Sequence, residues 1–140
     1  MLYLDTSLLV AALTNEPDTE RMQGWLGRHA EGDLAISDWV ATEFSSALSI
    51  KLRAGHIEPA HRADALAMFA RLCADNFLVV PVSRLQFRAA ARFADQHQLS
   101  LRAGDALHLA VCADHGATLC TLDRGVSDAG SALGIKTMLL

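Results

Sequence analysis

The sequence predicts an α/β fold, a three-layer α/β/α sandwich around a mainly parallel sheet of four to five strands. Short apolar runs alternate along the chain with segments of helical period, the order expected of strands joined by helices. Acids directly follow two of the apolar runs, at Asp5 and Asp123, and sites form at such carboxyl ends of parallel strands. Since 140 residues suffice for one hydrophobic core, we expect a single domain spanning residues 1–140.

The first half of the chain shows clear helix starts and stops. A turn sequence, Asn15–Asp18, precedes the second helix, which Asp18 or Thr19 can cap. Gly55 ends the long third helix, and Pro59 stands in the first turn of the fourth. The predicted elements, in order, are a strand at 2–4, a helix at 7–14, a helix to about 30, a strand at 34–36, a long helix capped by Ser37 or Asp38, and a helix from about 59.

The second half continues the alternation. Pro81 closes a β-branched run, Ser83 can cap the following helix, and Gly116 stands in the usual terminating position after another. The predicted elements are a strand at 77–80, a helix from 83, a helix at 100–115, a strand at 118–122, a short helix at 126–133 and a final strand at 137–140.

Composition narrows the class of protein. Half of the residues are hydrophobic and only three are proline, which argues against disorder. No apolar stretch reaches 18 residues and the first run lacks a basic leader, so we expect neither a membrane span nor a signal peptide. Three widely spaced cysteines in apolar settings are typical of core thiols in a reducing cytoplasm. The net charge of -4 argues weakly against broad nucleic-acid binding, unless bound cations offset several acids.

Four acids are candidates for a common site. Asp5 and Asp123 each follow a predicted strand, and each can alternatively cap the next helix. Glu43 lies at the edge of the apolar stripe of the third helix, where chance placement is the alternative. Asp105 lies near a helix start, where the helix dipole favours an anion. Alternatively, Gly104 allows another backbone or a ligand to come close while Asp105 faces the same end of the sheet as Asp5.

Together, these acids predict a divalent-metal site. Mg²⁺ and Mn²⁺ prefer carboxylate oxygen and water as ligands. Carboxylates gathered in one place repel, which raises their pKa values until a cation binds. Such a site is suited to phosphodiester hydrolysis, because metal ions generate the attacking hydroxide and stabilise charge on the phosphate and on the leaving oxygen.

The chain resembles the PIN-domain ribonucleases and, more narrowly, the VapC-type toxins of bacterial toxin–antitoxin pairs. The resemblance covers nearly the whole chain and is specific in the combination and order of its motifs, which are Leu4-Asp5-Thr6-Ser7, Glu43 in a long helix, the run from Asp105 to Ala110, and Thr121-Leu122-Asp123-Arg124-Gly125. It implies a Mg²⁺-dependent ribonuclease, with Mn²⁺ as the alternative ion. It also implies a small VapB-like antitoxin as partner and a homodimer.

Residue roles follow from the same resemblance. It implies that the acidic metal-binding and catalytic set is Asp5, Glu43, Asp105 and Asp123, with Ser7 and Thr121 as polar supporting residues. Separately, Arg102 and Arg124 lie near two of the acids and are candidates for RNA phosphate contact.

Two further features have competing interpretations. Arg84, Arg88 and Arg92 share a helical stripe, which either tracks an RNA backbone or forms a solvated face opposite an apolar side made of Phe87, Ala91 and Ala94. His108 lies one helical turn after Asp105; we interpret it as a packed or partly exposed histidine, with a supporting role in the site as the alternative. No zinc, P-loop, dinucleotide-binding or serine-hydrolase motif occurs.

Two other functions remain open. An aspartyl-phosphate phosphatase would use Asp5 as nucleophile, but such enzymes usually place a second acid two residues later, where Ser7 stands. A non-catalytic interaction module would use the acids to bind a basic partner peptide. The leading prediction is a metal-dependent endoribonuclease that acts as the toxin of a toxin–antitoxin pair.

Overall fold

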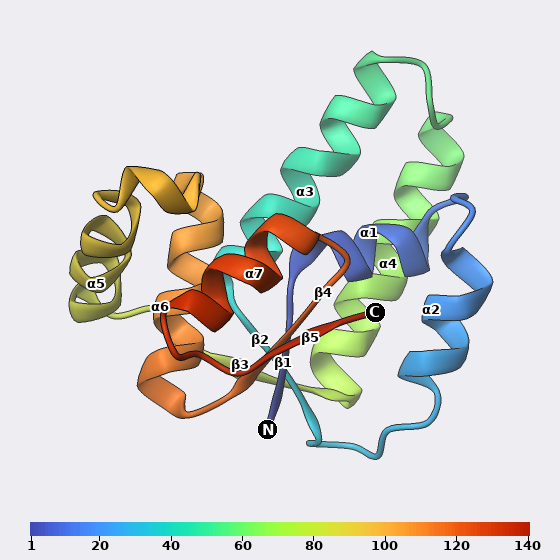
Figure 1. The fold of residues 1–140 in the computed structure, drawn as a ribbon. Coiled ribbons are helices and arrows are strands. Elements are labelled where there is room, and N and C mark those ends of the chain that lie inside the picture. Colours follow the sequence, from blue (N-terminus) through green and yellow to red (C-terminus); the bar gives the residue numbers. More distant parts are fainter.

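A five-stranded parallel sheet forms the centre of the molecule (Figure 1). The computed structural model describes all residues from 1 to 140. The strand order is β3-β2-β1-β4-β5, and every neighbouring pair is parallel, which confirms the predicted α/β class. The strands are β1 (Leu2–Leu4), β2 (Leu34–Ser37), β3 (Phe77–Val80), β4 (Thr118–Thr121) and β5 (Thr137–Leu139).

Helices cover both faces of this sheet. Figure 1 shows α5 and α6 on one side and α2 and α4 on the other, and α1 packs against α2, α3 and α4. The helices are α1 (Thr6–Leu13), α2 (Thr19–Leu26), α3 (Asp38–Arg53), α4 (Pro59–Asp75), α5 (Arg84–Ala94), α6 (Ala103–His115) and α7 (Arg124–Ala132). The predicted number and order of elements are thus confirmed, with boundaries displaced by a few residues.

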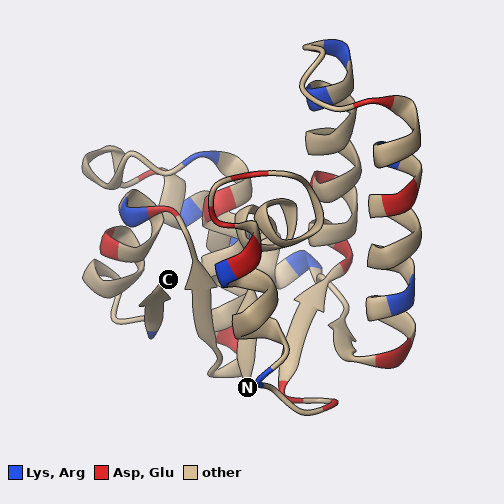
Figure 2. Cartoon of the chain, turned by 90° about the vertical axis from the view of Figure 1, so that its right-hand side faces the viewer, with Lys and Arg blue, Asp and Glu red and all other residues tan.

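The helices α3 and α4 form a pair that extends beyond the carboxyl ends of the strands (Figures 1 and 2). Figure 2 shows basic residues near the tip of this pair, where Lys51 and Arg53 occupy the last turn of α3. Cations at a helix C-terminus interact favourably with the helix dipole. Gly55 follows in a left-handed conformation, with φ of 74°, and ends the helix as predicted.

The main core lies between the sheet and the α1–α4 layer. Tyr3 and Leu4 of β1 and Leu8 and Leu9 of α1 are fully buried, and Phe44 of α3 stacks on Phe69 of α4. Burying a side chain of this size stabilises the fold by roughly 1.5–3 kcal/mol. A smaller cluster joins α5 to α6 and consists of Ala90, Ala106, Leu107 and Ala110.

The sequence-based prediction of which face of α5 packs inward is wrong. Phe87 is 53% exposed, and Ala91 and Ala94 are exposed as well, whereas Gln86 and Ala90 are buried. Gln86 takes the inward position because its side chain accepts a hydrogen bond from the Ser83 backbone N–H and donates another to Asp114 of α6. Two satisfied hydrogen bonds offset the cost of burying its amide.

Two further local predictions need correction. The helix predicted from Ser100 begins at Ala103, because Ser100 adopts a left-handed conformation with φ of 53° after the 3₁₀ turn His97–Leu99. Ser37 is the N-cap residue of α3, but its hydroxyl makes no capping bond and instead contacts Tyr3. No helix in the structure is both long and apolar enough to cross a lipid bilayer.

Candidate metal centre

Asp5 lies at the carboxyl end of β1, as the sequence predicted. The parallel pairing of Leu4 with Cys120 brings the end of β4 alongside it. Asp5 is only 7% exposed, and its carboxylate accepts hydrogen bonds from Thr121 Oγ1 at 2.5 Å and Ser7 Oγ at 3.0 Å. Its other oxygen accepts the backbone N–H of Ser7 at 3.3 Å, which caps α1. Asp5 therefore caps a helix and faces the site, and the two predicted supporting residues are its direct partners.

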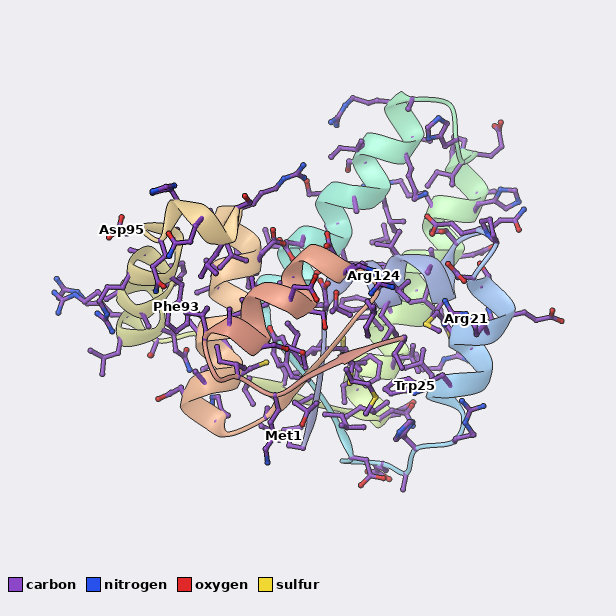
Figure 3. The ribbon with its side chains drawn as sticks, viewed as in Figure 1. Met1, Arg21, Trp25, Phe93, Asp95 and Arg124 are labelled. Atoms are coloured by element: carbon purple, nitrogen blue, oxygen red, sulfur yellow. The ribbon has the colours of Figure 1, made fainter.

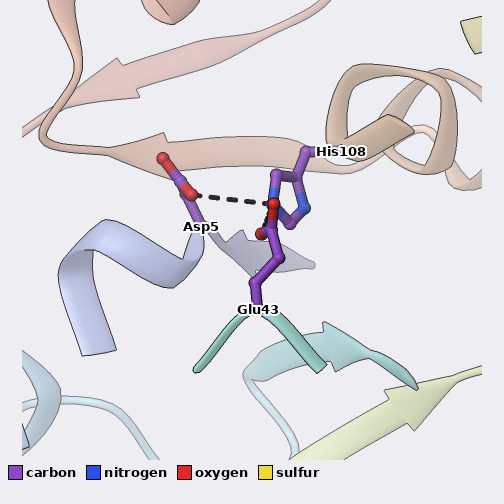
Figure 4. A group of neighbouring side chains, drawn as sticks. All are labelled: Asp5, Glu43 and His108. Carbon is purple, nitrogen blue, oxygen red and sulfur yellow. Dashed lines mark hydrogen bonds and ion pairs between the residues drawn. The ribbon is translucent and has the colours of Figure 1, made fainter. Parts of the chain in front are cut away.

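Glu43 reaches the same place from α3. Its Oε2 accepts hydrogen bonds from Thr6 Oγ1 and from His108 Nε2, both at 2.6 Å. His108 Nε2 lies 3.7 Å from Asp5 Oδ1. One ligand atom from each of Asp5, Glu43 and His108 lies within 4.8 Å of the other two (Figure 4).

His108 is the residue that the sequence interpretation undervalued. It is 1% exposed, and its Nδ1 lies 3.0 Å from the hydroxyl oxygen of Tyr3, which in turn lies 2.6 Å from Ser37 Oγ. Its position one turn after Asp105 was a signal, and so was a tyrosine in the middle of a buried strand, since a buried phenol needs a polar partner. Thr6 and Trp39 also contact Glu43, and no pattern in the sequence indicated that they would.

The other two predicted acids lie outside this three-residue group. Asp105 is half-buried, and its Oδ2 accepts the backbone N–H of Arg102 at the start of α6, at 3.2 Å. Asp123 is exposed and caps α7 by accepting the N–H of Val126 at 3.2 Å. The capping alternative for Asp123 is therefore realised, and Asp105 occupies the first turn of α6, as its alternative interpretation predicted.

Electrostatic effects nonetheless connect Asp105 with the group. Burial raises its pKa, the Arg102 N–H opposes that shift, and the negative charges of Asp5 and Asp123 raise the pKa further. The mutual repulsion expected of gathered acids is thus present at Asp105. Binding of a cation nearby would relieve it.

The pKa of Glu43 shifts in the opposite direction, downward. Burial, the largest effect, tends to raise its pKa, but the hydrogen bond and charge of His108, together with Thr6 and Trp39, lower the pKa overall. Its side chain is 27% exposed, so solvent also reaches the carboxylate. Glu43 is therefore an ionised acceptor at neutral pH.

Gly104 provides space for Glu43. A Cβ atom added at Gly104 would overlap Oε1 of Glu43 and would lie 3.3 Å from Nε1 of Trp39. The indole N–H of Trp39 is buried there without a hydrogen bond of standard geometry, although it lies close enough to help lower the pKa of Glu43. The group that lies close to Gly104 is therefore the side chain of Glu43, whereas the sequence predicted a backbone or a ligand there.

The two candidate phosphate-binding arginines lie at helix starts near the acids. Arg102 is the N-cap residue of α6 and Arg124 begins α7, and both are exposed. Figure 3 shows Arg124 at the opposite end of the strands from Met1, the end that carries Asp5. Exposed guanidinium groups at this edge are free to contact an anion.

A comparison with protein families identifies the fold. The profile of the PIN domain matches residues 2–131. The chain belongs to the PIN-domain family. A search of curated protein sequences found no match. The predicted family resemblance is thus confirmed.

Several solved structures share this PIN fold. VapC20 of Mycobacterium tuberculosis, described as a toxin that cleaves the sarcin–ricin loop, superimposes with a TM-score of 0.74 at 21% identity, covering 93% of this chain and 95% of its own. The FitAcB structure from Neisseria gonorrhoeae gives 0.70 at 19% identity, covering 99% and 96%. VapBC2 of Rickettsia felis, bound to a promoter DNA fragment, gives 0.69 at 15% identity, covering 100% and 99%. At these identities the likeness establishes the fold.

The donor set fits the ion that PIN-domain nucleases typically use, a divalent metal. Carboxylate oxygens of Asp5 and Glu43 are hard donors suited to Mg²⁺ and Mn²⁺, whereas Nε2 of His108 is occupied by its hydrogen bond to Glu43. Half-buried Asp105 supplies a further carboxylate whose raised pKa a bound cation would lower. The residues present therefore suit a divalent cation.

Proposed function

We propose that this PIN domain is a divalent-metal-dependent endoribonuclease and the toxin of a toxin–antitoxin pair. The observation that carries the proposal is the convergence of Asp5 from β1 and Glu43 from α3, with His108 of α6, at the carboxyl edge of the sheet. The toxin and toxin–antitoxin structures that share the fold support the biological role.

In this proposal, Asp5, Glu43 and Asp105 hold the ion, Mg²⁺ or Mn²⁺, and Asp123 completes the acidic edge. A divalent cation held there would supply Lewis-acid stabilisation of the phosphate and would lower the pKa of a nearby water molecule. Thr121 and Ser7 fix the Asp5 carboxylate, and Thr6 fixes that of Glu43. These hydrogen bonds hold the carboxylates in place, so less reorganisation accompanies catalysis.

The RNA substrate reaches this edge through its phosphates. Arg102 and Arg124 are exposed at the starts of α6 and α7 and present guanidinium groups that suit bidentate phosphate contact. We assign them to substrate binding, since neither forms a salt bridge within the protein.

Partners of the protein are a small antitoxin and a second copy of this chain. The complexes among the similar structures support the antitoxin. Large apolar side chains exposed on the edge strand β3 and on α5 support a homodimer, and these are Leu78, Val79, Leu85 and Phe87. Three unpaired cysteines support a reducing compartment, the cytoplasm.

Cleavage of RNA by the purified protein tests the activity. We expect cleavage with Mg²⁺ or Mn²⁺ and none with a chelator. We expect Asp5→Asn and Asp105→Asn each to lower the rate at least about a hundredfold, because removing one electrostatic stabiliser typically has an effect of this order. Asp128→Asn is the matched control, because Asp128 is exposed on α7 and should leave the rate unchanged. Cleavage by both site variants at the parental rate would overturn the assignment.

A further inference from the structure

A chain of hydrogen bonds passes through the core and ends on Glu43. Ser37 of β2 contacts the hydroxyl of Tyr3 at 2.6 Å, and that hydroxyl contacts Nδ1 of His108 at 3.0 Å. Nε2 of His108 then contacts Oε2 of Glu43 at 2.6 Å. The chain links β2, β1, α6 and α3, which are distant in sequence.

The interior members of this chain have no access to water. Tyr3 and Ser37 are fully buried and His108 is nearly so, whereas Glu43 is partly exposed. Burying three polar side chains is unfavourable unless their hydrogen bonds are made within the protein. Apolar side chains at the positions of Tyr3, Ser37 and His108 would avoid that cost. The presence of three polar side chains there therefore needs an explanation other than packing.

The direction of the last hydrogen bond in the chain is determined by its acceptor, Glu43. An ionised Glu43 only accepts, so His108 Nε2 must donate to it. On the other side of the ring, Nδ1 of His108 and the Tyr3 hydroxyl share the next hydrogen bond, at 3.0 Å. Each hydrogen bond therefore fixes the orientation of the next group.

The far side of Glu43 is equally constrained. Thr6 Oγ1 donates to the same Oε2 from α1, and Oε1 lies against Gly104, where no side chain intervenes. Two donors on Oε2 and the close approach of Oε1 to Gly104 restrict the rotation of the carboxylate, which lies beside Asp5.

We propose that Tyr3 and His108 are positioning residues that hold Glu43 in the orientation needed to bind the metal ion. This inference depends on the proposed function, because it assigns these residues to the same site. Outer partners that orient a metal ligand typically contribute about tenfold to a hundredfold to metal affinity.

The first test is the affinity of the purified protein for Mn²⁺, measured by titration calorimetry or by electron paramagnetic resonance of free Mn²⁺. Tyr3→Phe removes one hydroxyl and keeps the ring that packs in the core. We expect it to weaken Mn²⁺ binding by about tenfold or more. Thr137→Val is the control, because Thr137 also loses a hydrogen-bonded hydroxyl, but between α7 and β5. It should bind Mn²⁺ like the parent.

A double-mutant cycle shows whether Tyr3 acts through Glu43. We expect Tyr3→Phe to have no further effect on Mn²⁺ affinity in a Glu43→Gln background. Additive losses would overturn the proposal, since they would mean that Tyr3 affects the site by another route. His108→Gln, which keeps a donor N–H, should retain more affinity than His108→Leu; equal losses would mean that His108 does not act as a donor.

The outcomes separate this inference from the proposed function. If the parent binds Mn²⁺ and cleaves RNA while Tyr3→Phe and His108→Leu bind Mn²⁺ equally well, the positioning role is wrong and the nuclease assignment stands. If the parent binds no Mn²⁺, both are wrong.

Discussion

At the scale of single residues, Asp5 is stable in its buried position because three donors surround it. A buried carboxylate is costly unless its oxygens accept hydrogen bonds. Thr121 from β4 and Ser7 from α1 supply them. The position of Asp5 was predictable, because the boundary between an apolar run and a helix is visible locally. Its partner Thr121 lies 116 residues away and was found only through the family motif.

The hydrogen bond from Thr121 to Asp5 leads to a stability prediction. Thr121→Val should lower the free energy of unfolding by about 1.5–3 kcal/mol, because it removes a hydrogen bond to a charged, buried group. The measurement is urea denaturation monitored by circular dichroism. Thr42→Val is the control, because Thr42 is exposed on α3, and its effect should stay within about 0.5 kcal/mol. Equal stability of the Thr121 variant and the parent would contradict this account of Asp5.

Asp105 leads to a prediction about pH. Its folded pKa is raised, so its ionised form destabilises the metal-free fold once the pH exceeds the ordinary aspartate pKa. Asp105→Asn keeps an oxygen that can cap α6, and it should therefore stabilise the metal-free protein at neutral pH. This gain should shrink as the pH falls toward the ordinary aspartate value.

Thermal melts across this pH range, without metal, measure the effect. A variant that is less stable than the parent at pH 7 would mean that the helix cap dominates at Asp105, and not the burial of its charge together with the repulsion from Asp5. The same variant should lose the rise in melting temperature on addition of Mn²⁺, because a ligand that stabilises only the folded state must first bind it.

At the scale of secondary-structure elements, local patterns predicted most of the structure. Caps such as Ser83 and stops such as Gly55 and Gly116 are recognisable within a few residues, and the structure confirms them. The face of α5 was not predictable in this way. Gln86 turns inward because of Asp114, a residue of a different helix, so the hydrophobic pattern of α5 alone was misleading.

The approach of α3 to α6 depends on Gly104 and gives a matched pair of substitutions. Gly104→Ala places a methyl group where Glu43 Oε1 lies, so Glu43 must move. We expect weaker Mn²⁺ binding, by about tenfold or more, since a displaced ligand is equivalent to a lost orienting contact.

Gly24→Ala in α2 is the opposite case. A Cβ at Gly24 meets nothing within 4 Å, and the residue is exposed in a helix. This change should stabilise the protein by about 0.5–1 kcal/mol and leave Mn²⁺ affinity unchanged. Parental Mn²⁺ affinity in Gly104→Ala would contradict the proposed contact between Glu43 and the start of α6.

At the scale of the whole molecule, the parallel sheet brings the site together. Its order places β1 at the centre, between β2 and β4. Asp5, which directly follows β1, therefore lies near Thr121 at the end of β4 and near Glu43 of α3, the helix that follows β2. The alternation of strands and helices predicted this sheet. It did not predict the Tyr3–His108–Glu43 contacts, because they require the relative positions of β1, α6 and α3, which no local pattern contains.

We infer that acids distant in sequence form one cation-binding pocket in this protein. The most direct measurement is the melting temperature of the metal-free protein titrated with Mn²⁺, beside Asp5→Asn. We expect the melting temperature of the parent to rise, because Mn²⁺ binding adds RT ln(1 + [Mn²⁺]/Kd) to the free energy of unfolding, about 2.7 kcal/mol at a hundredfold excess over Kd. We expect no rise for the variant. A parent whose melting temperature is unaffected by Mn²⁺, or a variant that responds as the parent does, would contradict it.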